Sequence, residues 1–271
     1  AQFVEGIDLQ KRDFEKNAPC YIHGNYRPQG VWYYYLYAIL IKEPVGMLLL
    51  LAGALSQLVA SLRAPRSAVN ELCLFASAAL ALGFVSSQTG LCRHLRYALP
   101  AFPFLYILAS SVLRSPTGGR ASLAARLSSA VLLTWLVVGT VCVSPHYLSH
   151  FNELVGGSNN GHHHLLGSNV EWDQDLMFVA DWAARHPEAT DLQLVYRGLF
   201  DERWLGLNER SSIFYGSESS AAMTVPPGWY AVNVNELHRP DGRCSAFQRL
   251  SPVDRVAHSY FIYHVAPAAT S

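Results

Sequence analysis

Four uncharged apolar stretches, each long enough to span a lipid bilayer, constrain this sequence more than any other feature. They are residues 45–62, 72–90, 97–113 and 128–145. A helix of roughly 20 apolar residues crosses the hydrocarbon core, and a helix satisfies all of its backbone hydrogen bonds internally. The sequence therefore predicts four transmembrane helices and the fold class of a multipass α-helical membrane protein.

Composition supports this prediction. Hydrophobic residues make up 51% of the chain and charged residues only 15%, which is too few charges to cover the surface of a soluble protein evenly. Basic and acidic residues balance at 20 each, so no excess of positive charge favours a nucleic-acid partner. The four stretches contain no charged residue, which disfavours a transporter or channel.

Arginines in the short loops predict how the helices are oriented. The loop between the first and second helices contains Arg63 and Arg66, and the loop between the third and fourth contains Arg114, Arg120 and Arg126. The loop between the second and third helices contains only Arg93 and Arg96. Positive loops stay on the cytoplasmic side. Residues 1–44 and 146–271 are therefore expected to be extracytoplasmic, which in a bacterium means periplasmic.

The segment before the first predicted span has a different character. Residues 31–41 are rich in tyrosine and tryptophan, which favour the membrane interface, and Lys42, Glu43 and Pro44 separate them from the span. We expect an interfacial helix here. Its aromatic side chains could also stack on a sugar or a prenyl chain, although anchoring is the more frequent role of such residues.

Residues 146–271 are expected to form an extracytoplasmic α/β domain. A loop rich in Gly, Asn and His opens it, a helix is predicted at 176–186 with Asp173 or Asp175 as its cap, and strands are predicted at 191–198, 228–237 and 257–265. Of the five cysteines, Cys20, Cys92 and Cys244 would face the oxidising side, where one disulfide could form.

Four stretches of the sequence, taken in order, form a recognisable pattern: GNYRPQGVWYYYLYAILIKEP (24–44), RHLRYALPAFPFLYILAS (93–110), YLSHFNELVGGSNNG (147–161) and SNVEWDQDL (168–176). Together they resemble membrane glycosyltransferases of family 39, which are relatives of the protein O-mannosyltransferases and of the bacterial aminoarabinose transferase. The chain resembles the C-terminal half of bacterial members that end in a periplasmic α/β domain. In the last stretch this sequence has Glu171 and Asp173 where members of that family usually have Asp and Gly.

The resemblance implies transfer of a sugar from a polyprenyl-phosphate donor to a protein, lipid or glycan acceptor at the outer membrane face. It implies no nucleotide-sugar donor, and the reaction requires no metal or other cofactor. Family members carry an acidic catalytic motif in their first extracytoplasmic loop. No position here corresponds to it, so the catalytic residue is expected upstream of this chain.

Binding of such a donor needs cations at headgroup level, where the phosphate lies. The expected donor-phosphate residues are Lys42, Arg93, His94, Arg96 and Tyr97. In this interpretation Arg93 or Arg96 pairs with the phosphate through two hydrogen bonds, and Lys42 stabilises the departing phosphate as a point charge. The alternative role of these cations is anchoring among lipid headgroups.

Two other clusters carry weaker predictions. Glu171, Asp173 and Asp175 are second-tier candidates for acceptor binding, with helix capping as their alternative role. The run His162 to His164 could suggest a metal, but three consecutive residues do not easily converge on one ion, so a solvated loop and no metal are predicted. The functional hypothesis is a membrane glycosyltransferase; its alternative is a non-catalytic membrane-anchored binding module.

Overall fold

The chain forms two compact units, Ala1–Asn160 and Gly161–Ser271. The sequence predicts the division after residue 145, whereas residues 146–160 belong to the first unit, where Asn152 and Lys42 tie them to helix α2. The structure is a computed structural model. It describes residues 4–9, 19–62, 68–88, 90, 92–113, 120–198, 200–207 and 225–267.

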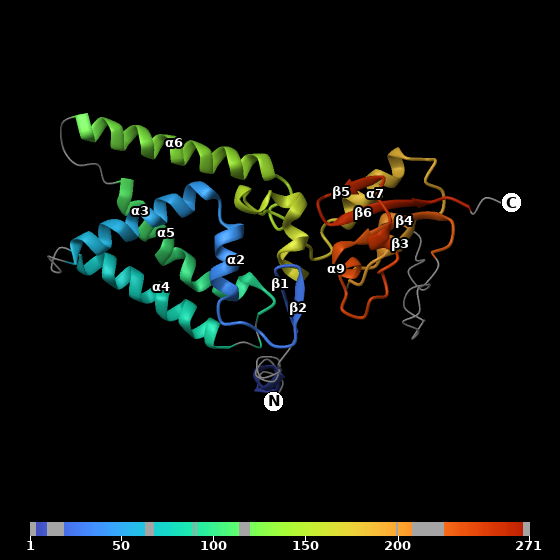
Figure 1. Ribbon diagram of the computed structural model, residues 1–271, viewed down its shortest axis with the longest axis horizontal. Helices are drawn as coiled ribbons and strands as arrows, with labels where there is room; N and C mark the ends of the chain where they lie inside the picture. The colour runs from blue at the N-terminus through green and yellow to red at the C-terminus, as the bar shows by residue number, and fades with distance from the viewer. Residues whose placement is uncertain are drawn as a thin grey trace. The chain divides into compact units, whose positions relative to one another are not determined.

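The described part of the first unit consists mainly of helices. Helix α5 packs against α3 and α4, and α6 packs against α3 (Figure 1). The elements are α2 (Tyr34–Lys42), α3 (Val45–Ser61), α4 (Val69–Ser87), η3 (Leu95–Ala101), α5 (Phe102–Ser110), η4 (Ser111–Leu113), α6 (Arg120–Val143) and η5 (Glu153–Val155). The loop arginines Arg63, Arg66 and Arg114, on which the predicted orientation partly depends, lie outside the described residues.

Within the described residues, three helical segments are long and apolar enough to cross a membrane: Val69–Ser87, Leu95–Leu113 and Leu123–Val143. They correspond to the second, third and fourth predicted spans. The first predicted span corresponds to α3, which joins α2 at a bend of 120° and makes a fourth candidate if the bent pair counts as one span. The membrane class predicted from the sequence is confirmed to this extent.

Exposure distinguishes these helices from those of a soluble core. No residue in the most apolar 18-residue stretch of Leu123–Val143 is buried inside the protein. In the corresponding stretch of Val69–Ser87 only 6% of the residues are buried. A helix that is apolar all round needs apolar surroundings, because exposed hydrocarbon surface is unfavourable in water. Lipid supplies such surroundings.

Close helix contacts in this unit depend on glycine. A Cβ atom added to Gly46 of α3 would lie 2.9 Å from the backbone oxygen of Leu132 in α6. One added to Gly53 would lie 3.2 Å from a methyl carbon of Val112. Small residues let helix backbones approach closely where lipid removes the hydrophobic drive for helix association.

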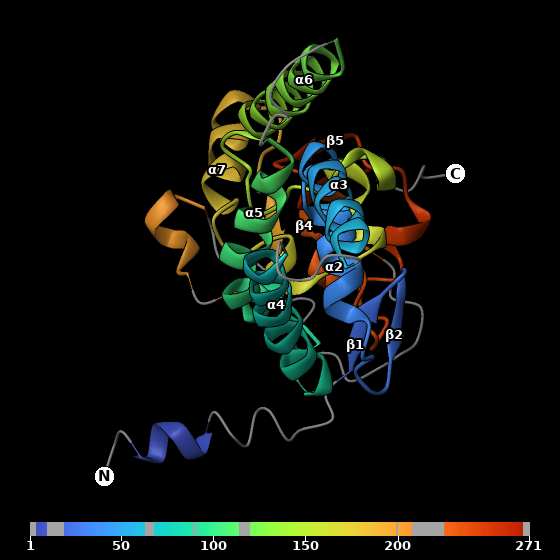
Figure 2. The ribbon, with the colours of Figure 1, turned by 90° about the vertical axis from the view of Figure 1, so that its left-hand side faces the viewer.

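Helix α2 is separate from α3, as the sequence predicts, but its aromatic run has two environments. Tyr34 and Tyr35 are buried in the protein, whereas Trp32 is exposed. The two tyrosines therefore pack rather than anchor the chain at an interface. Figure 2 shows α2 between the first turn of α3 and a small hairpin.

That hairpin, β1 (Cys20–Ile22) and β2 (Asn25–Arg27), is not predicted from the sequence. Its turn uses His23 and Gly24, both with positive φ, which suits a tight two-residue hairpin. Cys20 and Cys92 are buried, and their thiols interact. All five cysteines are free thiols in this structure.

The second unit contains a four-stranded sheet of order β3-β4-β6-β5. Strand β3 is parallel to β4, and the other two pairs are antiparallel. The strands are β3 (Gln193–Val195), β4 (Gly228–Asn233), β5 (Asp254–Val256) and β6 (Tyr260–Val265). The three predicted strands are confirmed in shorter form, and β5, which is three residues long with two exposed, is an addition.

Helix α7 (Leu176–Arg185) covers one face of this sheet, which confirms the predicted helix at 176–186. Its buried side chains Leu176, Val179 and Trp182 pack with Tyr260 and Ile262 of β6 in one apolar cluster. Side chains alternate along a strand, so Phe261 and Tyr263 belong to the opposite face. On that face Phe247 packs against Tyr230 and Tyr263.

The remaining elements are η6 (Ser158–His163), η7 (Gly167–Asn169), η8 (Glu202–Leu205), α9 (Val234–Leu237) and η9 (Phe247–Arg249).

Candidate functional site

The bend between α2 and α3 holds the first of the predicted site residues. Lys42 is the last residue of α2, and its Nζ donates a hydrogen bond of 2.8 Å to the carbonyl oxygen of Leu148. The same ammonium lies 4.2 Å from the centre of the Phe151 ring, within the range of a cation–π interaction. The carbonyl and the ring together hold the cation at the bend.

Asn152 stabilises the backbone of the bend. Its side-chain amide donates to the carbonyl oxygens of Leu40 and Glu43, each at 2.7 Å, and its backbone N–H donates to Ile41 at 2.8 Å. A helix that stops and turns leaves its last carbonyls without intrahelical partners. Asn152 supplies those partners, which is what a broken helix needs where water is scarce.

Other polar side chains gather around Lys42. The Tyr106 hydroxyl donates to both carboxylate oxygens of Glu43, at 3.1 and 3.2 Å. His150 is half-buried close to Lys42 and Glu153, and within the described part of the chain neither of its ring nitrogens has a hydrogen-bond partner. Burial, and then the charge of Lys42, lower the pKa of His150, so its imidazole is neutral at pH 7.

A second group of predicted residues lies at the start of the span Leu95–Leu113, with Arg93 and His94 just before it and Arg96 and Tyr97 in its first turn. The guanidiniums of Arg93 and Arg96 are exposed, and His94 is half-buried between them in the sequence. Burial, followed by the charges of Arg96 and Arg93, lowers the pKa of His94 to about 4. The Tyr97 ring is 5.7 Å from the ring of His94 and 5.4 Å from the guanidinium carbon of Arg96.

These two groups lie near opposite ends of α2. The Cys92 thiol donates to the carbonyl oxygen of Val31 at 3.3 Å, which places the 92–97 loop at the start of α2, whereas Lys42 is its last residue. Nine helical residues span roughly 12 Å. The structure therefore brings Arg93, His94, Arg96 and Tyr97 together and holds Lys42 at a separate bend.

The three acidic second-tier candidates lie in the second unit and have structural partners. Glu171 is buried and accepts a hydrogen bond of 3.1 Å from the Asn233 side chain. Burial outweighs that bond and, with the charges of Asp173 and Asp175, raises the pKa of Glu171 to about 7. Asp173 accepts from the backbone N–H of Phe200 at 3.1 Å.

The capping role considered for Asp173 or Asp175 needs a correction. Asp175 occupies the N-cap position of α7, but its side chain makes no capping hydrogen bond. It is buried instead, and its carboxylate accepts a hydrogen bond from the Ser259 hydroxyl. Asp173 has a φ of 64°, the left-handed conformation that glycine adopts most readily.

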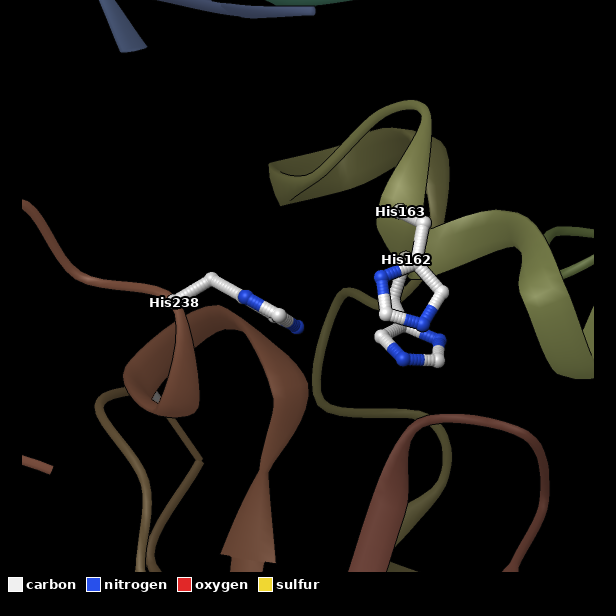
Figure 3. Close-up of side chains that lie close together, drawn as sticks. All are labelled: His162, His163 and His238. Atoms are coloured by element: carbon white, nitrogen blue, oxygen red, sulfur yellow. The ribbon is translucent and has the colours of Figure 1, made fainter. Parts of the chain in front are cut away.

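Two histidines of the consecutive run lie beside a third from a distant segment. His162 and His163, on η6, face His238, the residue that follows α9 (Figure 3). One ring nitrogen of each residue lies within 4.8 Å of those of the other two. His164 is outside this group. The run of consecutive histidines does not predict this arrangement, because nothing in the local sequence indicates that a strand and a short helix bring His238 beside it.

Several residues at the bend are not predicted as site residues from the sequence. Asn152, His150 and Phe151 lie in the stretch YLSHFNELVGGSNNG, which carries part of the family resemblance and predicts a loop but assigns them no role, and Glu43 is expected only to separate two helices. The one available signal was the Asn within a long loop, because amides satisfy exposed carbonyls well. Tyr106 lies in an apolar stretch, where a tyrosine is an ordinary residue of a membrane helix and does not indicate a site.

Comparison with known proteins adds no assignment, because no family model, curated protein or solved structure matches this chain. Function is therefore inferred from the residues and their geometry.

Proposed function

We propose that this chain belongs to an integral membrane glycosyltransferase that takes a sugar from a polyprenyl-phosphate donor on the extracytoplasmic face. The observation that carries the proposal is the cationic segment 92–97, where two exposed guanidiniums lie at the start of a membrane-length helical segment, Arg93 just before it and Arg96 in its first turn. A lipid-linked phosphate lies at that depth, just outside the hydrocarbon. Guanidiniums bind phosphate through paired hydrogen bonds, which fixes the orientation of the donor.

The surroundings of Arg93 and Arg96 suit this role. Because the pKa of His94 is about 4, the imidazole is neutral at pH 7 and adds no third charge beside the guanidiniums. It remains able to donate one hydrogen bond from its ring. The Tyr97 ring lies against both His94 and Arg96, which restricts their movement.

Lys42 has a different role in the proposal. Its ammonium is fixed by Leu148 and Phe151 at a bend that Asn152 stabilises with three hydrogen bonds. Burial lowers the pKa of Lys42 to about 7, and negative charge that develops on the departing phosphate favours the protonated, cationic form of this side chain. We assign phosphate binding to Arg93 and Arg96 and stabilisation of the departing phosphate to Lys42. No residue of this chain is assigned as the catalytic carboxylate.

The test is transfer of radiolabelled sugar from a polyprenyl-phosphate donor in membranes that contain the complete gene product. We expect Arg93→Ala and Arg96→Ala to raise KM for the donor tenfold or more, about 1.4 kcal/mol. We expect Lys42→Ala to lower kcat by a similar factor with a smaller change in KM. The matched control is Arg27→Ala, which removes an exposed arginine of the same unit, on strand β2.

Two outcomes would overturn the proposal. The first is unchanged transfer in the Arg93, Arg96 and Lys42 variants at equal expression. The second is the absence of transfer from any polyprenyl-phosphate sugar by the complete protein. In that case the rival explanation, a membrane-anchored extracytoplasmic module that binds but does no chemistry, takes its place.

A further inference from the structure

The three clustered histidines come from two separate segments of the second unit. His162 and His163 lie on a turn that is closed by hydrogen bonds from the backbone N–H groups of His164 and Leu165 to the carbonyl of Gly161, at 2.9 and 3.0 Å. His238 follows α9, where its backbone N–H donates to Val234 at 3.2 Å. Both segments are thus fixed by main-chain hydrogen bonds, and the fold rather than the sequence run brings the imidazoles together.

Ring packing holds the imidazole of His162 in place. The ring of His162 is buried and stands edge-on to Phe261 of β6, with the ring centres 5.1 Å apart. It is 4.0 Å from the ring of His163 and 5.2 Å from that of His238. An apolar wall behind metal-ligating histidines is a common feature of metal sites, since it controls solvent access and local dielectric.

The spacing is close to that of a metal centre. Tetrahedral Zn²⁺ with Zn–N bonds of about 2.0–2.1 Å separates its nitrogen ligands by roughly 3.3 Å. The cluster's nitrogens lie within 4.8 Å of one another, so small side-chain rotations close the site. His163 is exposed and can rotate readily, and its exposure also provides an entry path for an ion.

A charged side chain beside the cluster has acidic partners of its own. Arg239, the residue after His238, pairs with Asp241 at 2.8 Å and with Glu236 at 3.5 Å, which offsets its positive charge near the proposed metal position.

We propose that His162, His163 and His238 bind one divalent transition-metal ion of the zinc class. Three imidazoles leave a fourth position for water or another ligand, which is the arrangement of an open rather than a closed structural site. Mg²⁺ and Ca²⁺ prefer oxygen ligands, so three imidazole nitrogens do not form a site for either ion. This proposal does not rest on the proposed glycosyl transfer.

The experiment uses the whole chain, purified in detergent and stripped of metal with a chelator. Co²⁺ is added first, because its visible absorption reports the coordination number, and Zn²⁺ is then added to displace it. We expect one strong site per chain, with the intense visible bands of four-coordinate Co²⁺ that Zn²⁺ abolishes. His163→Ala and His238→Ala should each weaken Zn²⁺ binding tenfold or more, about 1.4 kcal/mol.

The matched control is His164→Ala, which removes the third histidine of the run but no member of the cluster, and we expect its affinity to change less than twofold. The proposal is overturned if His164→Ala and His163→Ala lose Zn²⁺ affinity equally, or if His238→Ala binds Zn²⁺ as the parent chain does. Either result would show that the run of consecutive histidines alone holds the ion. Circular dichroism without metal identifies any variant that misfolds. His163→Ala, at an exposed position, keeps the test valid if His238→Ala does misfold.

Discussion

The two units bury their apolar side chains in opposite ways. In the second unit Leu194, Ala231 and Ile262 are completely inaccessible, as expected for a sheet covered by a helix. In the first unit α6 presents apolar side chains outward along its length, Val131 among them at 63% exposed. Both units are rich in hydrophobic residues, so composition alone does not distinguish them.

The difference shows that burial within the chain is no measure of how well an apolar residue is solvated. A side chain of α6 gains from lipid what Ile262 gains from its neighbours, since both leave water. Polar groups follow the same division: Asn152 satisfies the carbonyls of a broken helix, whereas Asn233 binds Glu171 and caps α9 within a packed domain.

The largest expected effect comes from placing a charge in α6. Val131→Lys puts an ammonium near the middle of the segment Leu123–Val143, where lysine in a spanning helix costs about 2.5–3.5 kcal/mol. We expect a large fall in the fraction of chain that resists extraction from membranes at alkaline pH. The matched control is Val253→Lys, at a residue of the second unit that is 57% exposed, and it should change stability by less than about 0.5 kcal/mol. Equal behaviour of the two variants would remove the distinction between the units.

The next effect is a pH dependence confined to the second unit. The pKa of Glu171 is raised in the folded state from 4.5 to about 7, so between these values the folded chain binds more protons than the unfolded chain. Its contribution to stability is therefore fully present below pH 4.5 and is lost as the pH rises toward 7. The loss amounts to roughly 3 kcal/mol.

Glu171→Gln removes this titration and keeps an oxygen that can accept from Asn233. We expect the variant to be more stable than the parent at pH 8 and close to it at pH 4.5. Hydrogen exchange of β4 and β6 peptides, compared between the two chains at each pH, measures the difference. Peptides from α3 to α6 serve as the internal control and should exchange identically. A constant difference across the pH range would contradict the buried acid.

The smallest expected effect concerns helix contacts in the first unit. Gly46→Ala places a methyl group 2.9 Å from the Leu132 carbonyl, so α3 and α6 must move apart, at a cost of about 1–2 kcal/mol. Thermal unfolding in detergent should show the loss. Gly139→Ala is the control on α6, because no atom lies within 4 Å of the added carbon. Equal melting of the two variants would argue against close packing of these helices.

Sequence patterns predicted the elements that depend on local periodicity and length. The uncharged stretches predicted the apolar helices, and the pattern Leu176, Val179, Trp182 predicted the amphipathic α7, because both signals lie within a single element. Strand β5 and the β1–β2 hairpin were not predicted. Each strand is three residues long, and such strands are stabilised by their partners rather than by their own composition.

For the candidate site, the sequence identified the cations but not their arrangement. Arg93, His94, Arg96 and Tyr97 are close in the chain and are therefore close in space, whereas the position of Lys42 depends on residues more than a hundred positions away. The prediction that Asp173 or Asp175 caps α7 is correct for the position of Asp175 but wrong for a capping side-chain hydrogen bond, for a similar reason. Ser259, 84 residues further on, competes for the carboxylate, and that partner cannot be read from the sequence around α7.

The sequence by itself determined which surroundings each part of the chain requires. Long uncharged helices require lipid, whereas alternating strands with an amphipathic helix form a packed domain in water. Tertiary structure alone decided which polar groups meet. Asn152 at the α2 bend and His238 beside His162 and His163 are brought there by segments far apart in the chain. Hydrophobic periodicity is local and non-directional, whereas hydrogen bonds and metal sites need specific atoms within a few ångströms, and only the folded chain sets those distances.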